Sequence, residues 1–278
     1  MTVSQTTSLN SQDIHYLASE NSVKLSILLP VRNEGANIPV TVKMLNLFVS
    51  CSQEIIIIYD FPEDNSVPVV NNLIKQYPNI TLLQNTQGAG VLNAVRTGIR
   101  ESHGKYILIY PADEILPIFA INDMILLLDE GCDFINCTRY SYGGKRLGGN
   151  LISGIISRLG NKTFTFLAGS DLSDATTGIK MFRKSVFPLF SFEFAPIGWA
   201  FAFEMSVKAQ LLDLKLGEVP LTSIDRLIGG VSTQNFKKWF IQYFRLYMWG
   251  ILKLRFRNRS NDVYKIIRRP YPKNNMEK

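Results

Sequence analysis

The sequence predicts an α/β protein built around a mostly parallel β-sheet. Apolar runs that read as buried strands recur at 25–31, 54–60 and 105–113, and stretches of helical spacing separate them. Strands and helices that alternate at this spacing form right-handed βαβ units. The chain has 278 residues, of which 46% are hydrophobic and 19% charged. This composition is globular, and the length allows a substantial core.

The first elements follow from their residue types. The run LSILLPV at 25–31 is apolar throughout, and RNEGANI after it opens a helical pattern that continues to about Phe48. The run EIIIIYD at 54–60 is rich in β-branched residues, which favours a second buried strand. A helix near 66–77 and a short strand at 80–85, ITLLQN, come next. The alternation of strand and helix is therefore regular up to this point.

The same alternation continues to about residue 140. The segment GAGVLNAVRTGIRES at 88–102 begins with glycines and becomes helical, and KYILIYPAD at 105–113 is another apolar strand. A helix around 117–130 and a strand at 133–139 complete this part. The strands of this half are expected to lie side by side in one sheet.

The chain after residue 140 is less regular. Residues 141–169 begin as a glycine-rich loop and become an apolar stretch that basic residues punctuate. Residues 170–187 read as a loop and a strand-like segment, and 198–222 as a helix and a strand. Residues 236–259 place aromatic and aliphatic side chains in two adjacent helical rows, which predicts an amphipathic helix. The expected organisation is a flexible leader at 1–22, an α/β domain at 23–235, and a basic amphipathic helix and tail at 236–278.

The positive charge of the chain is concentrated at its end. The net charge is +7, but residues 236–278 hold twelve Lys/Arg and two Asp/Glu, a local balance of +10. The rest of the chain holds eighteen Lys/Arg against twenty-one Asp/Glu, or −3. A nearly neutral body with a basic end indicates an anionic surface or partner at that end.

Composition argues against several kinds of functional site and against a secreted or membrane-spanning protein. The only histidines are His15 and His103, and His15 lies in the leader, so we expect neither a histidine-based zinc site nor a Ser-His-Asp triad. The three cysteines lack metal-ligand spacing and cannot all pair, which suits a reducing cytoplasm. The leader has neither the basic start nor the apolar stretch of a signal peptide. No run reaches the roughly 18 uncharged apolar residues of a spanning helix.

Polar residues follow the ends of the first two predicted strands. Asp60 ends the strand at 54–60, where its carboxylate can face the ligand crevice of an α/β sheet. An Asx-turn or a helix cap is the alternative interpretation of Asp60. Pro30, Arg32 and Glu34 follow the first strand, and Glu34 also suits the first turn of a helix, where the dipole favours an anion.

Two further strand ends carry candidate residues. Gly88 and Gly90 allow backbone N–H groups to approach a phosphate or a sugar closely, although packing glycines are an adequate alternative. Their segment, GAGVLN, is neither a Walker A loop nor a GxGxxG fingerprint. Asp113 is the last residue of the segment 105–113, where the apolar run ends in PADE, and a loop without chemical function is the alternative.

Taken together and in order, these motifs give the chain a family resemblance. They resemble family 2 nucleotide-sugar glycosyltransferases of the GT-A fold, and among these the dolichyl- or polyprenyl-phosphate sugar transferases. The resemblance covers roughly residues 24–250. It is carried by P-V-R-N-E at 30–34, Asp60, GAGVLNA at 88–94, Ala112-Asp113, SDATTGIKMFRK at 173–184 and EVPLTSIDRLIGGVST at 218–233.

The resemblance implies a nucleotide site and a metal site. Asp113 matches the second acid of an aspartate-any-aspartate motif that holds Mg²⁺ or Mn²⁺ on the diphosphate, so it is the expected metal ligand. The nucleotide-binding positions carried over are Pro30, Arg32, Glu34, Asp60, Gly88, Gly90, Asp113 and Ser232. A divalent ion with one protein carboxylate would complete its octahedron with substrate phosphates and water.

The resemblance also implies catalytic groups. Arg226 matches an arginine that contacts the diphosphate, where it can share the neutralisation of charge on the leaving group. Asp174 matches the acidic residue of the acceptor-side loop. It is a candidate base for a hydroxyl acceptor, an organiser of the acceptor, or a capping and turn residue. The expected catalytic residues are therefore Asp113, Asp174 and Arg226.

The chain departs from the family pattern at two acidic positions. The second strand of the family usually ends in two adjacent aspartates, and here the first is Tyr59. The first acid of the metal motif is replaced by Pro111, which has no side-chain ligand. Glu114 could substitute, but adjacent side chains on an extended segment point to opposite faces. We therefore expect weak metal binding in the absence of nucleotide.

Basic residues mark the expected acceptor and membrane contacts. Lys145 and Arg146 are expected near the crevice, where they would meet an acceptor phosphate. Lys237, Lys238 and Trp239 begin the amphipathic segment, which resembles an interfacial helix on anionic lipid. Ordinary core packing with solvated charge is the alternative. Basic residues between aromatics could also bind nucleic acid, but no recognised nucleic-acid fold accompanies them, so no such partner is expected.

The expected function is an inverting transfer of a sugar from a UDP- or GDP-sugar to a polyprenyl phosphate, dolichyl or undecaprenyl. The enzyme would lie in the cytoplasm, peripherally attached to the inner face of the membrane, and self-association is left open. Transfer to a sugar hydroxyl during polysaccharide synthesis is one alternative. A catalytically silent nucleotide-sugar-binding protein is another, because acids are missing at Tyr59 and Pro111.

Overall fold

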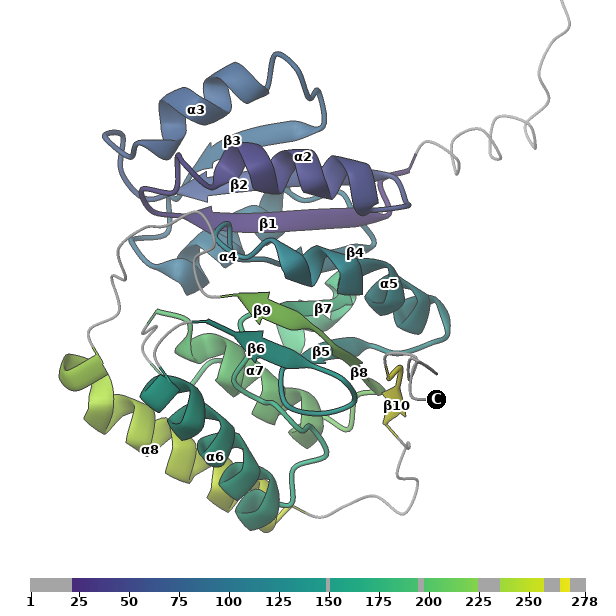
Figure 1. Cartoon of the computed structure of the whole chain (residues 1–278), viewed down its shortest axis with the longest axis vertical. Coiled ribbons are helices and arrows are strands. Elements are labelled where there is room, and N and C mark those ends of the chain that lie inside the picture. Colours follow the sequence, from purple (N-terminus) through teal and green to yellow (C-terminus); the bar gives the residue numbers. More distant parts are fainter. Residues whose placement is uncertain (1–21, 149–150, 195–197, 225–235, 258–265, 271–278) are drawn as a thin grey trace, which may run out of the picture.

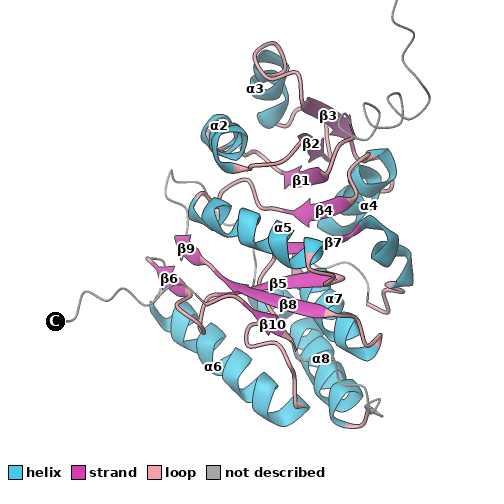
Figure 2. Cartoon of the chain, turned by 90° about the vertical axis from the view of Figure 1, so that its right-hand side faces the viewer, coloured by secondary structure: helices cyan, strands magenta, loops and turns pink. Residues whose placement is uncertain are grey.

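The computed structural model describes residues 22–148, 151–194, 198–224, 236–257 and 266–270, with the side chains of 151–153 and 236–240 outside the description. Its centre is an eight-stranded sheet in the order β10-β8-β5-β7-β4-β1-β2-β3. Figure 2 shows this sheet with helices on both faces. The strands are β1 (Leu25–Val31), β2 (Gln53–Tyr59), β3 (Ile80–Gln84), β4 (Tyr106–Ile109), β5 (Phe134–Thr138), β7 (Lys180–Arg183), β8 (Leu216–Pro220) and β10 (Ile267–Arg268).

The helices cover the two faces of the sheet in separate groups (Figure 1). α2, α3 and α5 contribute to one apolar core, and α4 and α7 contribute to the core on the opposite face. The helical segments are α2 (Ile38–Phe48), α3 (Ser66–Leu73), α4 (Val91–Glu101), η1 (Leu116–Ala120), α5 (Ile121–Asp129), α6 (Leu151–Ala168), η2 (Lys184–Leu189), α7 (Ala200–Leu211) and α8 (Phe236–Arg255).

The predicted α/β architecture is confirmed, with one strand reversed. β7 runs antiparallel to both β4 and β5, and the other pairings between described strands are parallel. The strand-like segment expected within 170–187 is this β7. Because it runs the other way, the loop that precedes it lies at the same edge as the carboxyl ends of its neighbours. That reversal brings residues 170–179 to the crevice.

Proline is tolerated inside β1 because of its place in the sheet. Pro30 is buried and pairs in register with Ile58 of β2. On the other side, the pairing of β1 with β4 ends at Leu28, so the missing N–H of Pro30 breaks no bond there. Pro30 therefore belongs to β1, and the expectation that it follows the first strand is wrong.

Some local structure differs from the pattern read in the sequence. The helix expected around 117–130 begins as the 3-10 turn η1, with Pro117 in its first turn, and becomes α-helical in α5. The apolar stretch after residue 150 is the helix α6. A small parallel ribbon joins β6 (Lys145–Leu147) to β9 (Thr222–Ile224). Short strands with few apolar residues carry little periodic signal, which explains why β6 and β9 were not expected.

The helix α8 is packed on one side and exposed on the other. Leu246 and Leu254 are buried in a third core with Phe164 of α6 and Phe203 of α7. The two rows expected here begin with Trp239 and Phe240, whose side chains lie outside the described residues. In the first row, Tyr243, Tyr247 and Ile251 pack against this core, whereas Phe244, Met248 and Leu252 of the second row are exposed. The packing alternative therefore holds for the first row and not for the second.

Within the described residues, none of the helices combines the length and the apolar character that crossing a bilayer requires.

Candidate active site

The candidate site lies where the parallel strands end. Val31 of β1 pairs with Tyr59 of β2, and Tyr59 pairs with Gln84 of β3, so the loops that follow are neighbours. β4 and β5 end at the same edge, because both run antiparallel to the β7 between them. The crevice beyond the carboxyl ends of such a sheet is where ligands bind in open α/β folds.

Asp60 holds the glycine-rich loop that follows β3. One of its oxygens accepts a hydrogen bond from Nδ2 of Asn85 (2.8 Å), and the other accepts from the backbone N–H of Gly90 (3.0 Å). Asn85 also donates to the carbonyl of Gly88 (2.7 Å) and accepts from Oγ1 of Thr97 (3.1 Å). Asp60 is half-buried, so its outer face can still meet a nucleotide.

The two glycines of this loop have backbone angles that side chains disfavour. Gly88 has φ +89° and Gly90 has φ +121°, and Gly90 directly precedes α4. A Cβ at Gly90 would meet no atom within 4 Å, so its glycine is required by backbone conformation and not by packing. An open, glycine-lined helix start of this kind suits the backbone approach of a phosphate.

The loop after β1 is tied to the loop after β2. Asp64 is buried and accepts from the backbone N–H of Asn33 (3.0 Å) and of Ser66 (2.8 Å). Glu34 accepts from Nδ2 of Asn37 (2.7 Å), but it lies in the loop before α2 and not in the first turn of that helix, so the first-turn alternative is wrong. Arg32 is exposed, and its guanidinium lies 5.9 Å from the centre of the Phe61 ring. The loop thus presents Arg32 to solvent while Asp64 holds it in place.

A set of hydrogen bonds shapes the turn that carries Asp113. The Tyr110 hydroxyl donates to the carbonyl of Glu114 (2.6 Å), and Oγ1 of Thr41 donates to the carbonyl of Ala112 (2.7 Å). Asp113 is half-buried between these points. One oxygen of the Glu114 carboxylate accepts from Oγ of Ser223 in β9 (2.7 Å).

The donor set fits a metal that the substrate helps to bind. In the described part of the chain, no group of three or more His, Cys, Asp or Glu side chains could hold a metal ion. Tyr59 packs against the apolar core, and Pro111 offers no side-chain oxygen. Asp113 remains as a hard oxygen ligand at the crevice, which suits Mg²⁺ or Mn²⁺ when phosphate oxygens supply further positions.

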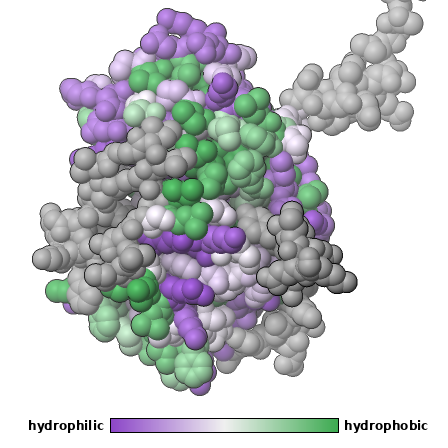
Figure 3. Space-filling model, viewed as in Figure 1, coloured by the Kyte–Doolittle hydropathy of each residue, from purple (hydrophilic) through white to green (hydrophobic). Residues whose placement is uncertain are grey.

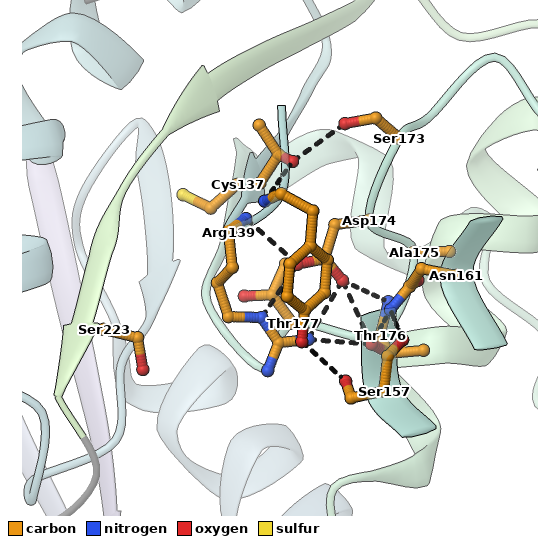
Figure 4. A network of polar contacts seen from close by, with 12 residues as sticks. Cys137, Arg139, Ser157, Asn161, Ser173, Asp174, Ala175, Thr176, Thr177 and Ser223 are labelled. Atoms are coloured by element: carbon orange, nitrogen blue, oxygen red, sulfur yellow. Dashed lines mark hydrogen bonds and ion pairs between the residues drawn. The ribbon is translucent and has the colours of Figure 1, made fainter. Parts of the chain in front are cut away.

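Asp174 forms a buried ion pair with Arg139 (Figure 4). Nε of Arg139 donates to Oδ2 (2.8 Å) and Nη2 donates to Oδ1 (3.0 Å), while the backbone N–H of Arg139 also donates to Oδ2 (3.1 Å). The hydroxyl of Thr176 donates to Oδ1 (3.0 Å). The Asp174 side chain is 0% exposed, so both of its oxygens are satisfied inside the protein.

The ion pair sets the protonation state of both partners. Burial raises the pKa of Asp174, but the charge and hydrogen bonds of Arg139 outweigh it, and the pKa lies below its usual value. Burial lowers the pKa of Arg139, and Asp174 reverses this to give a raised pKa. A carboxylate with a low pKa and fully occupied oxygens is a poor general base. The geometry therefore speaks against the base alternative. The backbone N–H of Thr176 also donates to Oδ1 of Asp174 (3.3 Å), as the turn alternative expects, and the role as organiser of the acceptor stays a prediction.

Arg139 is a site residue that the sequence analysis missed. It follows β5 directly, in the same position relative to its strand as Asp60 has relative to β2. Nη1 of Arg139 has no acceptor among the described residues, and Figure 4 shows this nitrogen outside the network. Its position at the end of a predicted buried strand could have identified Arg139 as a candidate. The basic candidates instead lie in the glycine-rich segment that follows, at Lys145 and Arg146.

The two basic residues expected near the acceptor lie in the ribbon beside the site. Lys145 and Arg146 belong to β6, where Arg146 pairs in register with Ser223 of β9. Ser223 in turn donates to Glu114, so β9 contacts the Asp113 turn and β6 is the strand paired with β9. Arg226 and Ser232 lie outside the described residues. Lys237, Lys238 and Trp239 are in the first turn of α8, but their side chains lie outside the description.

Known proteins with related sequences are sugar transferases. The dolichol-phosphate mannosyltransferase of Pyrococcus furiosus is 26% identical over 205 residues, covering 72% of this chain and 56% of that protein. The dolichyl-phosphate beta-glucosyltransferase of Dictyostelium discoideum is 28% identical over 262 residues, covering 84% of this chain and 78% of that protein. The chain thus spans little more than half the length of the archaeal relative.

Solved structures of glycosyltransferases share the fold. Glucosyl-3-phosphoglycerate synthase from Mycobacterium tuberculosis, solved with Mn²⁺, UDP and glucosyl-3-phosphoglycerate, superposes with a TM-score of 0.60 at 14% identity. The match covers 85% of this chain and 82% of that one. A mannosyltransferase from Pyrobaculum calidifontis, solved with GDP-mannose and Mn²⁺, gives a TM-score of 0.57 at 14% identity, covering 87% and 67%. These likenesses establish the GT-A fold.

The family itself is identified by a sequence profile. The profile of glycosyl transferase family 2 matches residues 26–189, which is more than half of the chain. The matched segment contains Asp60, the glycine-rich loop, Asp113 and the Arg139–Asp174 pair. The chain therefore belongs to glycosyl transferase family 2.

Proposed function

We propose that the enzyme transfers a sugar from a UDP- or GDP-sugar to the phosphate of a polyprenyl lipid, with inversion, at the cytoplasmic face of a membrane. The names of the Pyrococcus and Dictyostelium relatives support this acceptor class. The observation that carries the proposal is the ion pair between Asp174 and Arg139, which leaves the acceptor side with a cation in place of a base.

The ion pair discriminates between two kinds of acceptor. A sugar hydroxyl must lose its proton as it attacks, so it needs a carboxylate or another base within reach. Asp174 is bound on both oxygens and has a lowered pKa, so it does not serve that purpose. A phosphate monoester is ionised at neutral pH and needs positive charge to hold it. Nη1 of Arg139 and the nearby Lys145 and Arg146 supply such charge.

The reaction is a direct displacement at the anomeric carbon. Asp60 and the glycine-rich loop that it holds bind the nucleoside. Asp113 is then the carboxylate next to the diphosphate. Arg139 holds the acceptor phosphate so that one of its oxygens approaches the anomeric carbon from the face opposite the diphosphate. That oxygen forms the new bond as the bond from carbon to diphosphate oxygen breaks. The electron pair of the broken bond remains on the departing nucleoside diphosphate.

The charge that develops on the leaving group has to be neutralised. A divalent ion held by Asp113 supplies positive charge to the diphosphate when it is bound. Arg226 is proposed to contact the same group, although it lies outside the described residues. Because Asp113 is the single protein carboxylate expected to hold the ion, metal affinity rises when nucleotide is present.

The acceptor proposal is tested with matched lipid substrates. The full chain is incubated with UDP- and GDP-sugars and Mn²⁺, and with either farnesyl phosphate or farnesol. We expect a sugar-phosphate-lipid product from the first and no product from the second. Product formed on sugar oligomers but not on farnesyl phosphate would overturn the acceptor assignment. Titration calorimetry with UDP and GDP, with and without Mn²⁺, tests the donor side, and nucleotide binding without any turnover would favour the silent alternative.

The membrane contact is proposed for the outer faces of α6 and α8, which lie side by side at one end of the molecule (Figures 1 and 2). Figure 3 shows apolar and hydrophilic residues together over this end. Phe166 of α6 is 82% exposed, and Phe256, just beyond α8, is 78% exposed. Apolar side chains bordered by basic ones suit an anionic lipid surface. The exposed basic residues on these two helices are Arg158, Lys162, Arg245, Lys253 and Arg255.

The membrane proposal is tested by sedimentation with vesicles of phosphatidylglycerol and phosphatidylcholine. Phe166→Ser and Phe256→Ser together are expected to reduce the pelleted fraction severalfold while leaving nucleotide binding unchanged. The matched control is Phe119→Ser, because Phe119 is also exposed (50%) but lies in η1, away from α6 and α8. Equal pelleting of the double variant and the wild type would rule out this surface.

A further inference from the structure

Three buried polar side chains lie side by side on three neighbouring strands, next to the loop at 170–179 that precedes β7. Lys180 of β7, Asn136 of β5 and Glu218 of β8 are each 0% exposed. They lie in one row, because Asn136 pairs in register with Lys180 on one side and with Glu218 on the other. Nζ of Lys180 donates to Oδ1 of Asn136, and Nδ2 of Asn136 donates to Oε1 of Glu218 (3.2 Å). The row is a continuous chain of hydrogen bonds across three strands.

The row is polar only at the end of the strands next to the site. Two residues further from the crevice, the same face carries Phe134, Phe182 and Leu216, which pack in the apolar core with α7. Apolar side chains therefore suffice to join these strands and helix. Burying an amine and a carboxylate costs free energy that apolar groups of similar volume would avoid. The polar row requires a reason other than sheet packing.

Each member of the row holds the backbone of the segment that precedes β7. Asn136 donates to the carbonyl of Asp174 (2.9 Å). Glu218 accepts from the backbone N–H of Ser173 (2.8 Å). Nζ of Lys180 lies 3.4 Å from the carbonyl of Ala175, which also accepts from Oγ of Ser206 in α7 (2.9 Å). Three consecutive residues, Ser173, Asp174 and Ala175, are thus fixed from below.

This segment is the support of the Arg139 guanidinium. The Asp174 carboxylate takes two side-chain hydrogen bonds from Arg139 and orients its plane (Figure 4). The orientation of the guanidinium depends closely on the position of the carboxylate, because a small displacement of the carboxylate breaks one of the two parallel hydrogen bonds. Any loosening of the backbone at Asp174 therefore reaches Arg139. The centre of the Tyr140 ring also lies 5.1 Å from the guanidinium carbon of Arg139.

We infer that Lys180, Asn136 and Glu218 are positioning residues that fix Arg139, through Asp174, for binding the phosphate of the acceptor. The assignment of Arg139 to the acceptor rests on the proposed function, whereas the mechanical coupling to Arg139 does not. The three side chains are each 0% exposed, so we assign them a positioning role and not a binding role. Their effect is transmitted by the backbone of residues 173–175.

Protonation of the row is compatible with this role. Burial lowers the pKa of Lys180 to about 7, and the charge of Asp174 acts in the opposite direction. Cys137 and Glu218 also favour its charged form, and Arg139 disfavours it. Burial raises the pKa of Glu218, which the hydrogen bonds from Ser173 partly offset. Lys180 keeps N–H donors in either form, so its bond to Asn136 survives deprotonation.

The experiment compares two variants that break the row with two that do not. Lys180→Met removes the amine, and Glu218→Leu removes the acceptor of the Ser173 N–H. Glu218→Gln removes the charge but keeps an oxygen for that N–H, so it is the conservative rescue. Lys208→Met is the matched control, because Lys208 of α7 is also buried (6% exposed) but binds Ser191 and Glu193. Thermal melting establishes that each variant is folded.

The first measurement is the Nε–Hε signal of Arg139 in protein labelled with ¹⁵N-arginine, assigned by its absence in Arg139→Lys. Lys180→Met and Glu218→Leu are expected to move this signal toward the position of exposed arginines and to speed its hydrogen exchange by about tenfold or more. Glu218→Gln and Lys208→Met are expected to leave it in place. An unmoved signal in both row-breaking variants, or a shifted signal in Glu218→Gln, would overturn the inference.

The second measurement is kinetic, with farnesyl phosphate as acceptor. The row-breaking variants are expected to raise the KM for farnesyl phosphate about tenfold and to change the KM for the nucleotide sugar less than twofold, a split that a general loss of stability would not produce. Equal changes in both constants would contradict the positioning role. If the wild type shows no transfer to farnesyl phosphate, the proposed function fails, and the arginine signal still decides the coupling.

Discussion

The Arg139–Asp174 pair offers the sharpest test of how the acceptor side is built. Asp174→Asn keeps the shape of the side chain and removes its charge. The two bonds from Nε and Nη2 of Arg139, 2.8 and 3.0 Å long, then meet one carbonyl oxygen and one NH₂ group. The guanidinium is left with an unneutralised charge in a site where its partner is 0% exposed. Both stability and acceptor binding are expected to fall.

The size of the loss follows from the burial of the pair. Removing one partner of a buried ion pair costs about 3–5 kcal/mol, because the remaining charge stays desolvated. The carbonyl oxygen of asparagine can still accept one bond from Arg139, which places the expected loss near the lower limit, about 3 kcal/mol. For a chain of this size, that corresponds to a fall in the melting temperature of roughly 6–12 °C.

The assay is urea unfolding of wild type and variant at several pH values. The lowered pKa of Asp174 means that its contribution is present above the unfolded pKa of about 4 and is lost as the pH falls through the folded value. The difference between wild type and Asp174→Asn should therefore be largest at neutral pH and shrink in acid. A double-mutant cycle with Arg139→Gln isolates the energy of the pair.

An exposed ion pair provides the control. Arg100 and Glu101 are 2.8 Å apart, but their side chains are 57% and 48% exposed, so Glu101→Gln should cost less than about 1 kcal/mol. A loss below about 1 kcal/mol for Asp174→Asn, or a loss independent of pH, would refute the reasoning. Unchanged turnover on farnesyl phosphate would also remove Asp174 from the organisation of the acceptor.

Three further predictions concern single residues. Lys180 has a folded pKa of about 7, so above that pH the unfolded chain binds more protons than the folded chain, and the free energy of unfolding should rise between about pH 7 and 10. Urea titrations across that range should show a smaller rise for Lys180→Met than for the wild type. Asn85→Ala removes hydrogen bonds to Asp60 and Gly88 and leaves the Thr97 hydroxyl without its acceptor, so calorimetry should show an affinity for UDP or GDP reduced about tenfold or more and a free energy of unfolding lowered by about 2 kcal/mol. Unchanged nucleotide affinity would contradict the role of this loop. Asp113→Asn should abolish the gain in nucleotide affinity that Mn²⁺ produces while leaving metal-free nucleotide binding intact, and a persistent Mn²⁺ effect would exclude Asp113 as the ligand.

Much of the fold and part of the site are encoded locally. Apolar runs and helical spacing predicted the strands and helices of the first 140 residues, because burial on both faces of a parallel sheet requires continuous apolar strands. Parallel strands end at one edge, so the positions of Asp60 and Asp113 could be inferred from the ends of β2 and β4 alone. The order of the motifs then identified the family, which the profile over residues 26–189 confirms.

Contacts between distant segments decided the rest. Arg139 and Asp174 lie 35 positions apart, and they meet because β7 runs antiparallel between β4 and β5. Sequence periodicity does not encode strand direction, so the pairing that turns a candidate base into the anchor of a cation was not visible in the sequence. The packing of α8 against α6 and α7 likewise decided which apolar row faces the core and which faces outward. Local pattern was enough to place Asp60 and Asp113 at the sheet edge, because each comes at the end of an apolar run. It was not enough for Arg139 and Asp174, because charge pairing and burial depend on neighbours in space.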